Sequence, residues 1–280
     1  ADLPADLAAK DAALREQLRS AGRVLVAFSG GVDSSYLAYA ASRALGADAL
    51  AVTAVSPSYP EHHRRMAEEI VARFAIAHRF VETHEMESDA YRANEPDRCY
   101  HCKSELFEVL GKLRDELGFD AVAYGINTDD TGDFRPGHRA ATERGVLSPF
   151  LDVALSKAEI RDLSRALEIP TADLPASACL SSRLPYGTEV TPERLRQVER
   201  GEEAVRLPRR SANLHPLQVG QRIDLPVGGV QCAGAMDVRR QEFHIGELVR
   251  RVMLHVVPQR PAGALRLAHH ERQFEDLDQR

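Results

Sequence analysis

The sequence predicts an α/β fold in which a parallel sheet is covered by helices on both faces. Two observations lead to this prediction. Short apolar segments alternate with amphipathic ones, as strands do when helical crossovers join them. One apolar segment also runs directly into a glycine turn and a helical pattern. Strands are expected over residues 24–28, 49–56, 79–83 and 121–126, and helices over residues 4–21, 34–45, 60–75 and 97–117.

Each of these elements carries a local signal. The first helix has Leu7, Leu14 and Leu18 on one stripe. The third begins at Pro60, because proline is favoured in a first helical turn. The strands are short apolar runs of the buried type, and 49–56 is the longest of them. In such a sheet the ligand site lies at the carboxyl ends of the strands, so the loops after residues 28, 55 and 126 should share one edge.

The second half of the chain has fewer signals. Residues 127–148 are predicted to form a long polar loop, and loops of that length are often functional. Ser156 and Glu159 form a capping box for a helix to about residue 167. Another helix should run from Thr191 to about residue 206. We expect one domain over residues 1–170 and a smaller, less predictable C-terminal region over residues 171–280.

The composition is that of a globular protein, with 44% hydrophobic and 28% charged residues. The net charge of −6 argues against a dominant nucleic-acid surface. The chain has no apolar run near the roughly 20 residues that span a bilayer, and its N-terminus lacks a signal-peptide pattern. We therefore expect no membrane partner, a cytoplasmic location, and cysteines that act as thiols, metal ligands or redox groups.

The glycine turn Ser29–Ser35 is the strongest candidate site. A strand, a glycine turn and a helix point backbone N–H groups and a positive helix end at an anion. The turn contains no lysine, so it is not the common Gly-Lys-Ser/Thr phosphate loop. The groups that could donate to a bound phosphate are those of Ser29, Gly30, Gly31, Val32, Ser34 and Ser35. Asp33 would repel phosphate, so we expect it either to bind Mg²⁺ or to cap the following helix.

The predicted loop after residue 126 is the second candidate. Asp129, Asp130 and Asp133 offer the hard oxygen ligands that Mg²⁺ prefers. Arg135 and Arg139 have the planar geometry to hold a carboxylate or a phosphate. The alternative is a solvated charged loop without a binding role. The expected position at the ligand edge of the sheet supports binding, so the two interpretations are about equally good.

The cysteines are the third candidate. Cys99 and Cys102 form a Cys-x-x-Cys pair that fits a redox pair, half of a zinc site with His101 nearby, or part of an iron–sulfur site. Cys179 precedes Ser181, Ser182 and Arg183, and a nearby arginine favours the thiolate. Its alternative is a buried cysteine that acts as a small hydrophobic residue. Cys232 has no chemical neighbourhood that indicates a role.

The motifs resemble a known family when they are taken together. Ser29–Ser35 is similar to the SGGxDS signature of the PP-loop ATP pyrophosphatase superfamily, whose fold is that of the adenine nucleotide α-hydrolases. With Arg98–Lys103, Gly125–Gly137 and Pro175–Gly187, in that order, it resembles the LarE family of ATP-dependent sulfur transferases. The resemblance covers about residues 5–206, and its last motif is the most specific.

The resemblance implies a reaction in nickel-pincer cofactor synthesis, which supplies lactate racemase maturation. ATP, with Mg²⁺, would adenylate a carboxylate of pyridinium-3,5-biscarboxylic acid mononucleotide and release pyrophosphate. Gly125 would join the ATP site, and Ser181, Ser182 and Arg183 the substrate site. Cys179 would donate its sulfur, or Cys99, Cys102 and Cys179 would hold a [4Fe-4S] cluster. Family members assemble into homo-oligomers, which implies the same here.

Residues 208–280 depart from the family pattern, so weak packing is expected there. Two alternatives stay open. One is another PP-loop enzyme, such as a tRNA thiolase or an amidotransferase, although the acidic balance disfavours tRNA. The other is a non-catalytic nucleotide-binding module with a structural zinc at the Cys-x-x-Cys pair.

Overall fold

The computed structural model describes residues 3–132 and 136–211. The chain divides into two units, Ala1–Glu203 and Ala204–Arg280. The account below concerns the first unit. The expected domain division after residue 170 stays a prediction, and the expectations for residues 212–280, with Cys232 among them, lie outside the described residues.

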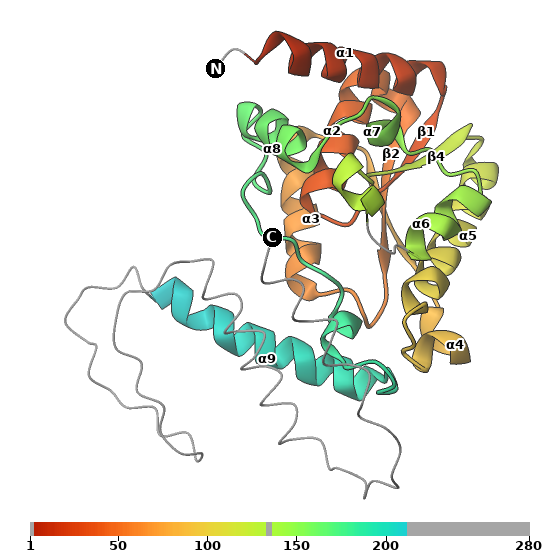
Figure 1. Ribbon diagram of the computed structural model, residues 1–280, viewed down its shortest axis with the longest axis vertical. Helices are drawn as coiled ribbons and strands as arrows, with labels where there is room; N and C mark the ends of the chain where they lie inside the picture. Colours follow the sequence, from red (N-terminus) through yellow and green to blue (C-terminus); the bar gives the residue numbers. More distant parts are fainter. Residues whose placement is uncertain (1–2, 133–135, 212–280) are drawn as a thin grey trace, which may run out of the picture. The chain divides into compact units, whose positions relative to one another are not determined.

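A four-stranded parallel sheet forms the centre of the first unit (Figure 1). Its order is β3-β2-β1-β4, so the central strand β1 lies between β2 and β4. In the register, Val24 of β1 is opposite Ala49 of β2 and Ala121 of β4. The strands are β1 (Val24–Ala27), β2 (Ala49–Val55), β3 (His78–Glu82) and β4 (Ala121–Tyr124). The predicted fold class is confirmed.

Helices cover both faces of this sheet. Alternate residues of each strand point to opposite faces, so the apolar side chains of each face pack against helices. Val24 and Val26 pack into a core with residues of α1, α2, α3 and α8. Leu25, between them, packs into a second core with residues of α5 and α6. The helices are α1 (Ala5–Ser20), α2 (Val32–Leu45), α3 (Glu61–Phe74), α4 (Asp89–Arg92), α5 (Arg98–Leu117), α6 (Pro136–Glu143), α7 (Pro149–Asp152), α8 (Lys157–Ala166) and α9 (Pro192–Ser211).

The segment predicted as one loop, residues 127–148, contains helical elements, so that prediction is wrong. It contains the 3-10 helix Thr128–Gly132 and the helix α6, and its end pairs with β4 through Leu147. Pro136 begins α6 where proline is favoured. Ala140 and Ala141 are buried in the core that α6 shares with α5. Packing against α5, which a local reading cannot detect, therefore stabilises a short polar helix.

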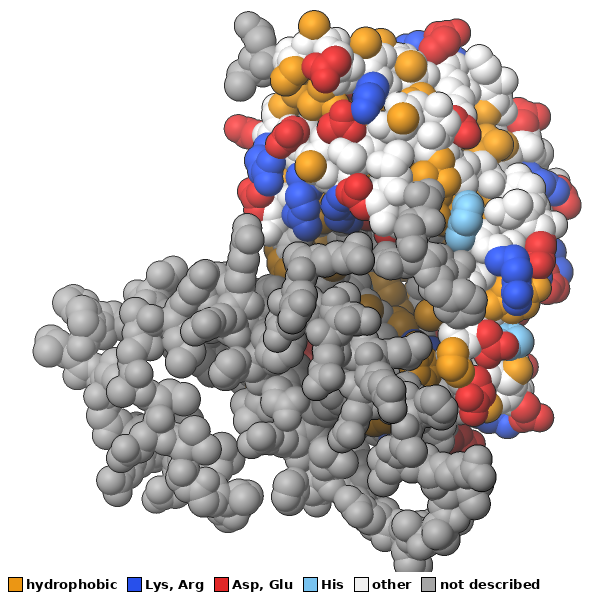
Figure 2. Space-filling model, viewed as in Figure 1, with side chains coloured by type: hydrophobic (Ala, Val, Ile, Leu, Met, Phe, Trp, Pro, Cys, Tyr) orange, Lys and Arg blue, Asp and Glu red, His pale blue; other side chains and the backbone are white. Residues whose placement is uncertain are grey.

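The described surface carries charges of both signs. On the face in Figure 2, Lys and Arg side chains are interspersed with those of Asp and Glu over the described part. Within the described ranges, no helix is both long and apolar enough to cross a membrane. Because the strands are parallel, the loops after β1, β2 and β4 meet at the carboxyl edge of the sheet, as predicted.

Candidate active site

The phosphate loop, residues 29–35, joins β1 to α2 in the predicted way. Gly30 has φ of +77°, a left-handed conformation that side chains disfavour. Gly31 is extended and precedes the first residue of α2. The hydroxyls of Ser34 and Ser35 both donate to the Gly31 carbonyl, at 3.2 and 2.7 Å. These buried hydroxyls therefore fix the shape of the turn, while their predicted contact with ATP stays a prediction.

The start of α3 forms another wall of the phosphate loop. A Cβ atom on Gly30 would lie 2.9 Å from the His63 carbonyl oxygen and 3.2 Å from the Ala67 nitrogen. Real Cβ atoms essentially never come that close to a backbone atom, so only glycine fits here. The Tyr59 hydroxyl donates to the Ser29 carbonyl at 3.0 Å. The conformation of the loop thus depends on a helix more than 30 residues away in sequence.

Gly125 also lies close to the loop. It directly follows β4, and a Cβ atom there would lie 3.0 Å from the backbone carbon of Asp33 and 3.1 Å from the Ser34 nitrogen. The end of β4 therefore packs closely against the first turn of α2. This brings together Gly125 and the phosphate loop, which the family resemblance had assigned to one site.

Asp33 does not cap α2, so that alternative is wrong. The N-cap residue is Gly31, and no side chain caps this helix. The Asp33 carboxylate instead accepts hydrogen bonds from the Asn127 amide at 3.2 Å and from the Lys157 ammonium at 2.5 Å. Lys157 follows the capping residue Ser156 and was missed in the sequence. The capping box marks its helix, but a partner 124 residues away leaves no local signal.

Asp129 lies near the same lysine. Its carboxylate accepts the backbone N–H of Lys157 at 2.8 Å, at the first turn of α8. The carboxylate of Asp130 accepts the Asn127 backbone N–H at 3.3 Å. Among the described residues, no three His, Cys, Asp or Glu side chains are grouped to hold a metal ion. The carboxylates predicted to bind Mg²⁺ therefore do not form a ligand set here, and Asp133 lies outside the described residues.

The two arginines predicted on this segment have different outcomes. Arg135 lies outside the described residues. Arg139 is on α6, where its guanidinium lies 4.2 Å from the centre of the Tyr100 ring and 3.6 Å from the Glu143 carboxylate. Its side chain is exposed, and its predicted contact with a carboxylate or phosphate stays a prediction.

The three described cysteines are free thiols. Cys99 and Cys102 lie in the first turns of α5, and Cys179 directly precedes the 3-10 helix Leu180–Arg183. The residue Cys102 is partly exposed, but its thiol is buried. This burial is the main reason that the pKa of the thiol rises to about 12. The Glu85 carboxylate and the thiols of Cys179 and Cys99 contribute to this rise. The fold therefore gathers the three cysteines that the sequence had singled out.

These thiols nevertheless do not form a ligand set for a cluster or a zinc ion. Among the described residues, the three thiols are not part of any group of three or more His, Cys, Asp or Glu side chains that could hold a metal ion. His101, the nearest candidate for a further zinc ligand, lies 3.4 Å from the Asp97 carboxylate. The residue types suit a cluster or a metal, but their arrangement here does not fit one.

The segment around Cys179 is fixed on its C-terminal side by buried polar groups. The Leu180 N–H donates to the Ser58 carbonyl at 3.0 Å. Ser181 is fully buried, with its hydroxyl 2.6 Å from that of Tyr91. The Arg98 guanidinium donates to the Ser181 carbonyl at 2.9 Å. Ser181 thus fixes the segment around Cys179 through buried hydrogen bonds, and its side chain does not lie at the surface.

The other two predicted substrate residues are nearer the surface. The Ser182 hydroxyl donates to the Cys179 carbonyl at 2.6 Å. Arg183 donates to the Glu202 carboxylate at 2.7 Å and to the Ser182 hydroxyl at 3.2 Å. The arginine expected to favour the Cys179 thiolate is therefore paired with a carboxylate of α9.

On the N-terminal side of Cys179 the chain is exposed. All residues of 173–178, here called the Cys179 arm, are exposed to solvent. Arg161 of α8 holds the start of the arm by donating to the carbonyls of Ala172 and Leu174, at 2.5 and 2.8 Å. Further along, the Ser177 hydroxyl is 2.8 Å from Nε2 of His63.

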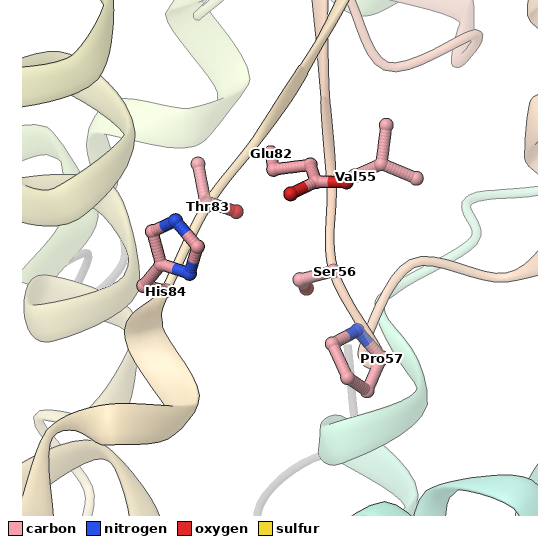
Figure 3. A pocket seen from close by; sticks show the side chains of 6 residues that line it. All are labelled: Val55, Ser56, Pro57, Glu82, Thr83 and His84. Atoms are coloured by element: carbon pink, nitrogen blue, oxygen red, sulfur yellow. The ribbon is translucent and has the colours of Figure 1, made fainter.

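An open hollow of about 320 Å³ lies at the carboxyl ends of β2 and β3 (Figure 3). The buried Glu85 follows it in the chain, and its carboxylate accepts hydrogen bonds from the hydroxyls of Ser56 and, at 2.9 Å, Ser58. These polar groups, also missed in the sequence, lie on the predicted ligand edge. The hollow is lined by Val55, Ser56, Pro57, Glu82, Thr83 and His84.

Comparison with known proteins agrees with this site. The family model described as asparagine synthase matches residues 8–102, which include the phosphate loop. The parallel sheet, the glycine turn and this match define an ATP-utilising enzyme of the PP-loop superfamily. The matched residues include the loop between β1 and α2, so the family model and the structure indicate the same class of enzyme.

Three relatives define the family. The chain is 42% identical over 238 residues to an uncharacterized protein of Synechocystis sp., covering 85% of this chain and 87% of the relative. It is 32% identical over 203 residues to the pyridinium-3,5-bisthiocarboxylic acid mononucleotide synthase of Lactiplantibacillus plantarum, covering 72% and 74%. An uncharacterized protein of Methanocaldococcus jannaschii is 30% identical, covering 69% and 73%. The chain belongs to the LarE family, PP-loop enzymes of ATP-dependent sulfur transfer.

Proposed function

We propose that this enzyme converts a carboxylate of pyridinium-3,5-biscarboxylic acid mononucleotide to a thiocarboxylate, with sulfur from Cys179. The relative from L. plantarum carries the name of a synthase for the bisthiocarboxylic product, which supports this substrate. The place of the reaction in nickel-pincer cofactor synthesis and the homo-oligomeric state belong to the same proposal.

One observation supports the proposal most. The loop after β2 contacts both the phosphate loop and the segment that carries Cys179. Ser58 accepts the backbone N–H of Leu180, and the next residue, Tyr59, donates to the Ser29 carbonyl. A carboxylate activated at the phosphate loop would therefore form beside a thiol that can attack it.

The proposed reaction has three steps. A carboxylate oxygen of the substrate attacks the α-phosphorus of ATP, and pyrophosphate leaves. The Cys179 sulfur, as thiolate, then attacks the carbonyl carbon of the acyl-adenylate, and AMP leaves with the bonding electron pair. Finally the Cβ–S bond of Cys179 breaks as its Cα–H proton is removed, which leaves a thiocarboxylate on the product and dehydroalanine in the protein.

The described residues have distinct parts in these steps. The N–H groups at the start of α2 would bind the departing pyrophosphate, whose charge suits a helix N-terminus. The Lys157 ammonium beside Asp33 places a positive charge next to the same turn. ATP would arrive with Mg²⁺, but because Asp33 and Asp129 do not form a ligand set with a third residue, no step is assigned to the ion.

A second source of sulfur is included in the proposal. Cys99, Cys102 and Cys179 are the residues that would hold a [4Fe-4S] cluster, and such a cluster would supply sulfide while Cys179 is kept. The arrangement of the three thiols does not fit a formed cluster, so no step is assigned to it. The experiment below distinguishes the two sources.

Intact mass spectrometry before and after turnover tests the proposal. With ATP, Mg²⁺ and the pyridinium dicarboxylate, the protein should lose the mass of H₂S, and peptide mapping should locate the loss at Cys179. Cys179→Ala should release pyrophosphate but form no thiocarboxylate. Product formed over many turnovers by iron-containing protein with an intact Cys179 would favour the cluster, whereas no pyrophosphate release with this substrate would overturn the proposal.

A further inference from the structure

A continuous path of contacts connects the phosphate loop to the Cys179 arm. It begins at the Ser29 carbonyl, which accepts the Tyr59 hydroxyl at 3.0 Å. The Tyr59 ring lies against the His63 ring, with centres 5.9 Å apart. Nε2 of His63 is then 2.8 Å from the Ser177 hydroxyl, two residues before Cys179. The start of α3 therefore lies between the nucleotide site and the sulfur donor.

The backbone of the same residue also contacts the phosphate loop. The His63 carbonyl lies so close to Gly30 that a Cβ there would be only 2.9 Å away. Gly30 has no side chain that could move to absorb a displacement. A shift of the turn on nucleotide binding would therefore be transmitted directly to residue 63, through packed backbone atoms.

The other end of the path can respond, because the arm is exposed. Residues 173–178 are all exposed, whereas Leu180 and Ser181 beyond Cys179 are buried and hydrogen-bonded. Cys179 thus lies at the boundary between an exposed segment and a fixed one. The hydrogen bond between His63 and Ser177 holds the exposed segment against the start of α3.

We propose that His63 is a positioning residue that couples nucleotide binding at the phosphate loop to the position of Cys179. His63 holds the arm through Ser177 in the free enzyme, and occupation of the phosphate loop changes this hold through Gly30 and Tyr59. The coupling rests on the proposed function of the phosphate loop and Cys179. It would expose the sulfur to the substrate only after ATP is bound, which protects a thiol that the enzyme consumes.

The rate of Cys179 alkylation tests this coupling without turnover. Iodoacetamide labelling under metal-free, reducing conditions would be followed by peptide mapping, with Cys99 as an internal reference. We compare the wild type with His63→Ala, Ser177→Ala and the double variant, each with and without α,β-methylene-ATP and Mg²⁺. Ser177→Thr serves as the matched control, because it keeps the hydroxyl at an exposed position.

Loss of the hydrogen bond should speed Cys179 labelling in the free enzyme by about fivefold, the range of one neutral hydrogen bond. The double variant should match the single ones, because both remove the same bond. The nucleotide should raise the rate of Cys179 labelling in the wild type and in Ser177→Thr. It should have little effect on this rate in the two alanine variants.

Wild-type rates in both alanine variants, or a nucleotide effect of unchanged size in them, would overturn the coupling. So would a wild type that binds the nucleotide with no change at Cys179. A wild type that binds no nucleotide by calorimetry would instead count against the proposed function, while the labelling of the free enzymes still decides whether His63 holds the arm.

Discussion

The phosphate loop and the Cys179 arm are two short segments of the same site with opposite construction. The loop is closed on itself by Ser34 and Ser35 and packed against α3 and Gly125. The arm is exposed throughout and held at separate points by Arg161 and His63. The comparison teaches that the loop is fixed by its own hydroxyls and by neighbouring backbone, whereas the arm is held at separate points, a difference that suits the phosphate-binding and sulfur-donating roles proposed for them.

The largest expected effect is that of Gly30→Ala, which tests the rigidity of the loop. The left-handed φ of +77° and the 2.9 Å approach to a backbone oxygen should together lower the free energy of unfolding by about 2–4 kcal/mol. ATP binding should be lost as well. Urea denaturation and a nucleotide titration measure the two effects.

Two controls sharpen this test. Gly31→Ala, with φ of −83° and a Cβ 3.5 Å from the Ser29 hydroxyl, should cost less than about 1 kcal/mol. Ala178→Gly, in the arm, should change stability by less than about 0.5 kcal/mol. Equal costs at Gly30 and Gly31 would contradict the account of the loop.

Lys157→Ala tests the support of the loop by α8. It would leave the Asp33 carboxylate, whose side chain is 21% exposed, without its cation. Such a half-buried pair should contribute about 1–2 kcal/mol, between the values for surface and buried pairs. ATP affinity should fall too. Lys112→Ala breaks an exposed pair with Glu108 and should change neither quantity.

Arg161→Ala tests how the arm is held. It removes two hydrogen bonds to the carbonyls of Ala172 and Leu174, which should cost about 1 kcal/mol because water replaces part of them. Cleavage within residues 174–178 by a nonspecific protease should become several times faster, on the order of fivefold. Arg196→Ala, which breaks an exposed pair with Glu193, should leave the cleavage rate unchanged. An equal increase in both variants would show that Arg161 does not hold the arm.

The smallest expected effect is that of Glu159→Gln at the start of α8. The hydrogen bond from Lys10 is the main reason that the pKa of Glu159 lies below its ordinary value of 4.5. The folded state holds the carboxyl proton of Glu159 less tightly than the unfolded state does. The interaction therefore stabilises the fold above pH 4.5, and this stabilisation is lost as the pH falls through the folded pKa. Solvent screening limits it to less than about 1 kcal/mol.

Denaturation of this variant and the wild type at about pH 7 and about pH 3 measures the effect. The difference in stability should be present at the higher pH and be smaller at the lower one. A difference of the same size at both values would show that packing, and not charge, accounts for it.

The sequence predicted the fold and the phosphate loop because both depend on local patterns. The alternation of apolar runs predicted every strand, and Ser156 with Glu159 predicted the cap of α8, which is confirmed. The helix α6 was missed because its two buried alanines gain stability from a core to which α5 and the sheet contribute. Its polar sequence by itself favours a loop.

The partners within the site were less predictable for the same reason. Lys157 lies 124 residues from Asp33, and Ser177 lies 114 residues from His63. Neither pair has a recognisable spacing in the sequence, because only the folded chain brings its two members together. Cys99 and Cys102 could be identified because the Cys-x-x-Cys spacing is local, whereas the approach of Glu85 and Cys179 that raises the pKa of Cys102 depends on the fold.

The approach of α3 to Gly30 has a consequence for protein engineering. A graft of Ser29–Ser35 onto another strand and helix would transfer the glycines and the hydroxyls. It would not transfer the backbone of residues 63 and 67, which confines Gly30 from outside the segment. The grafted heptapeptide would therefore lack the backbone contacts that fix its conformation. A minimal ATP-binding scaffold built from this protein must retain α3 together with the loop.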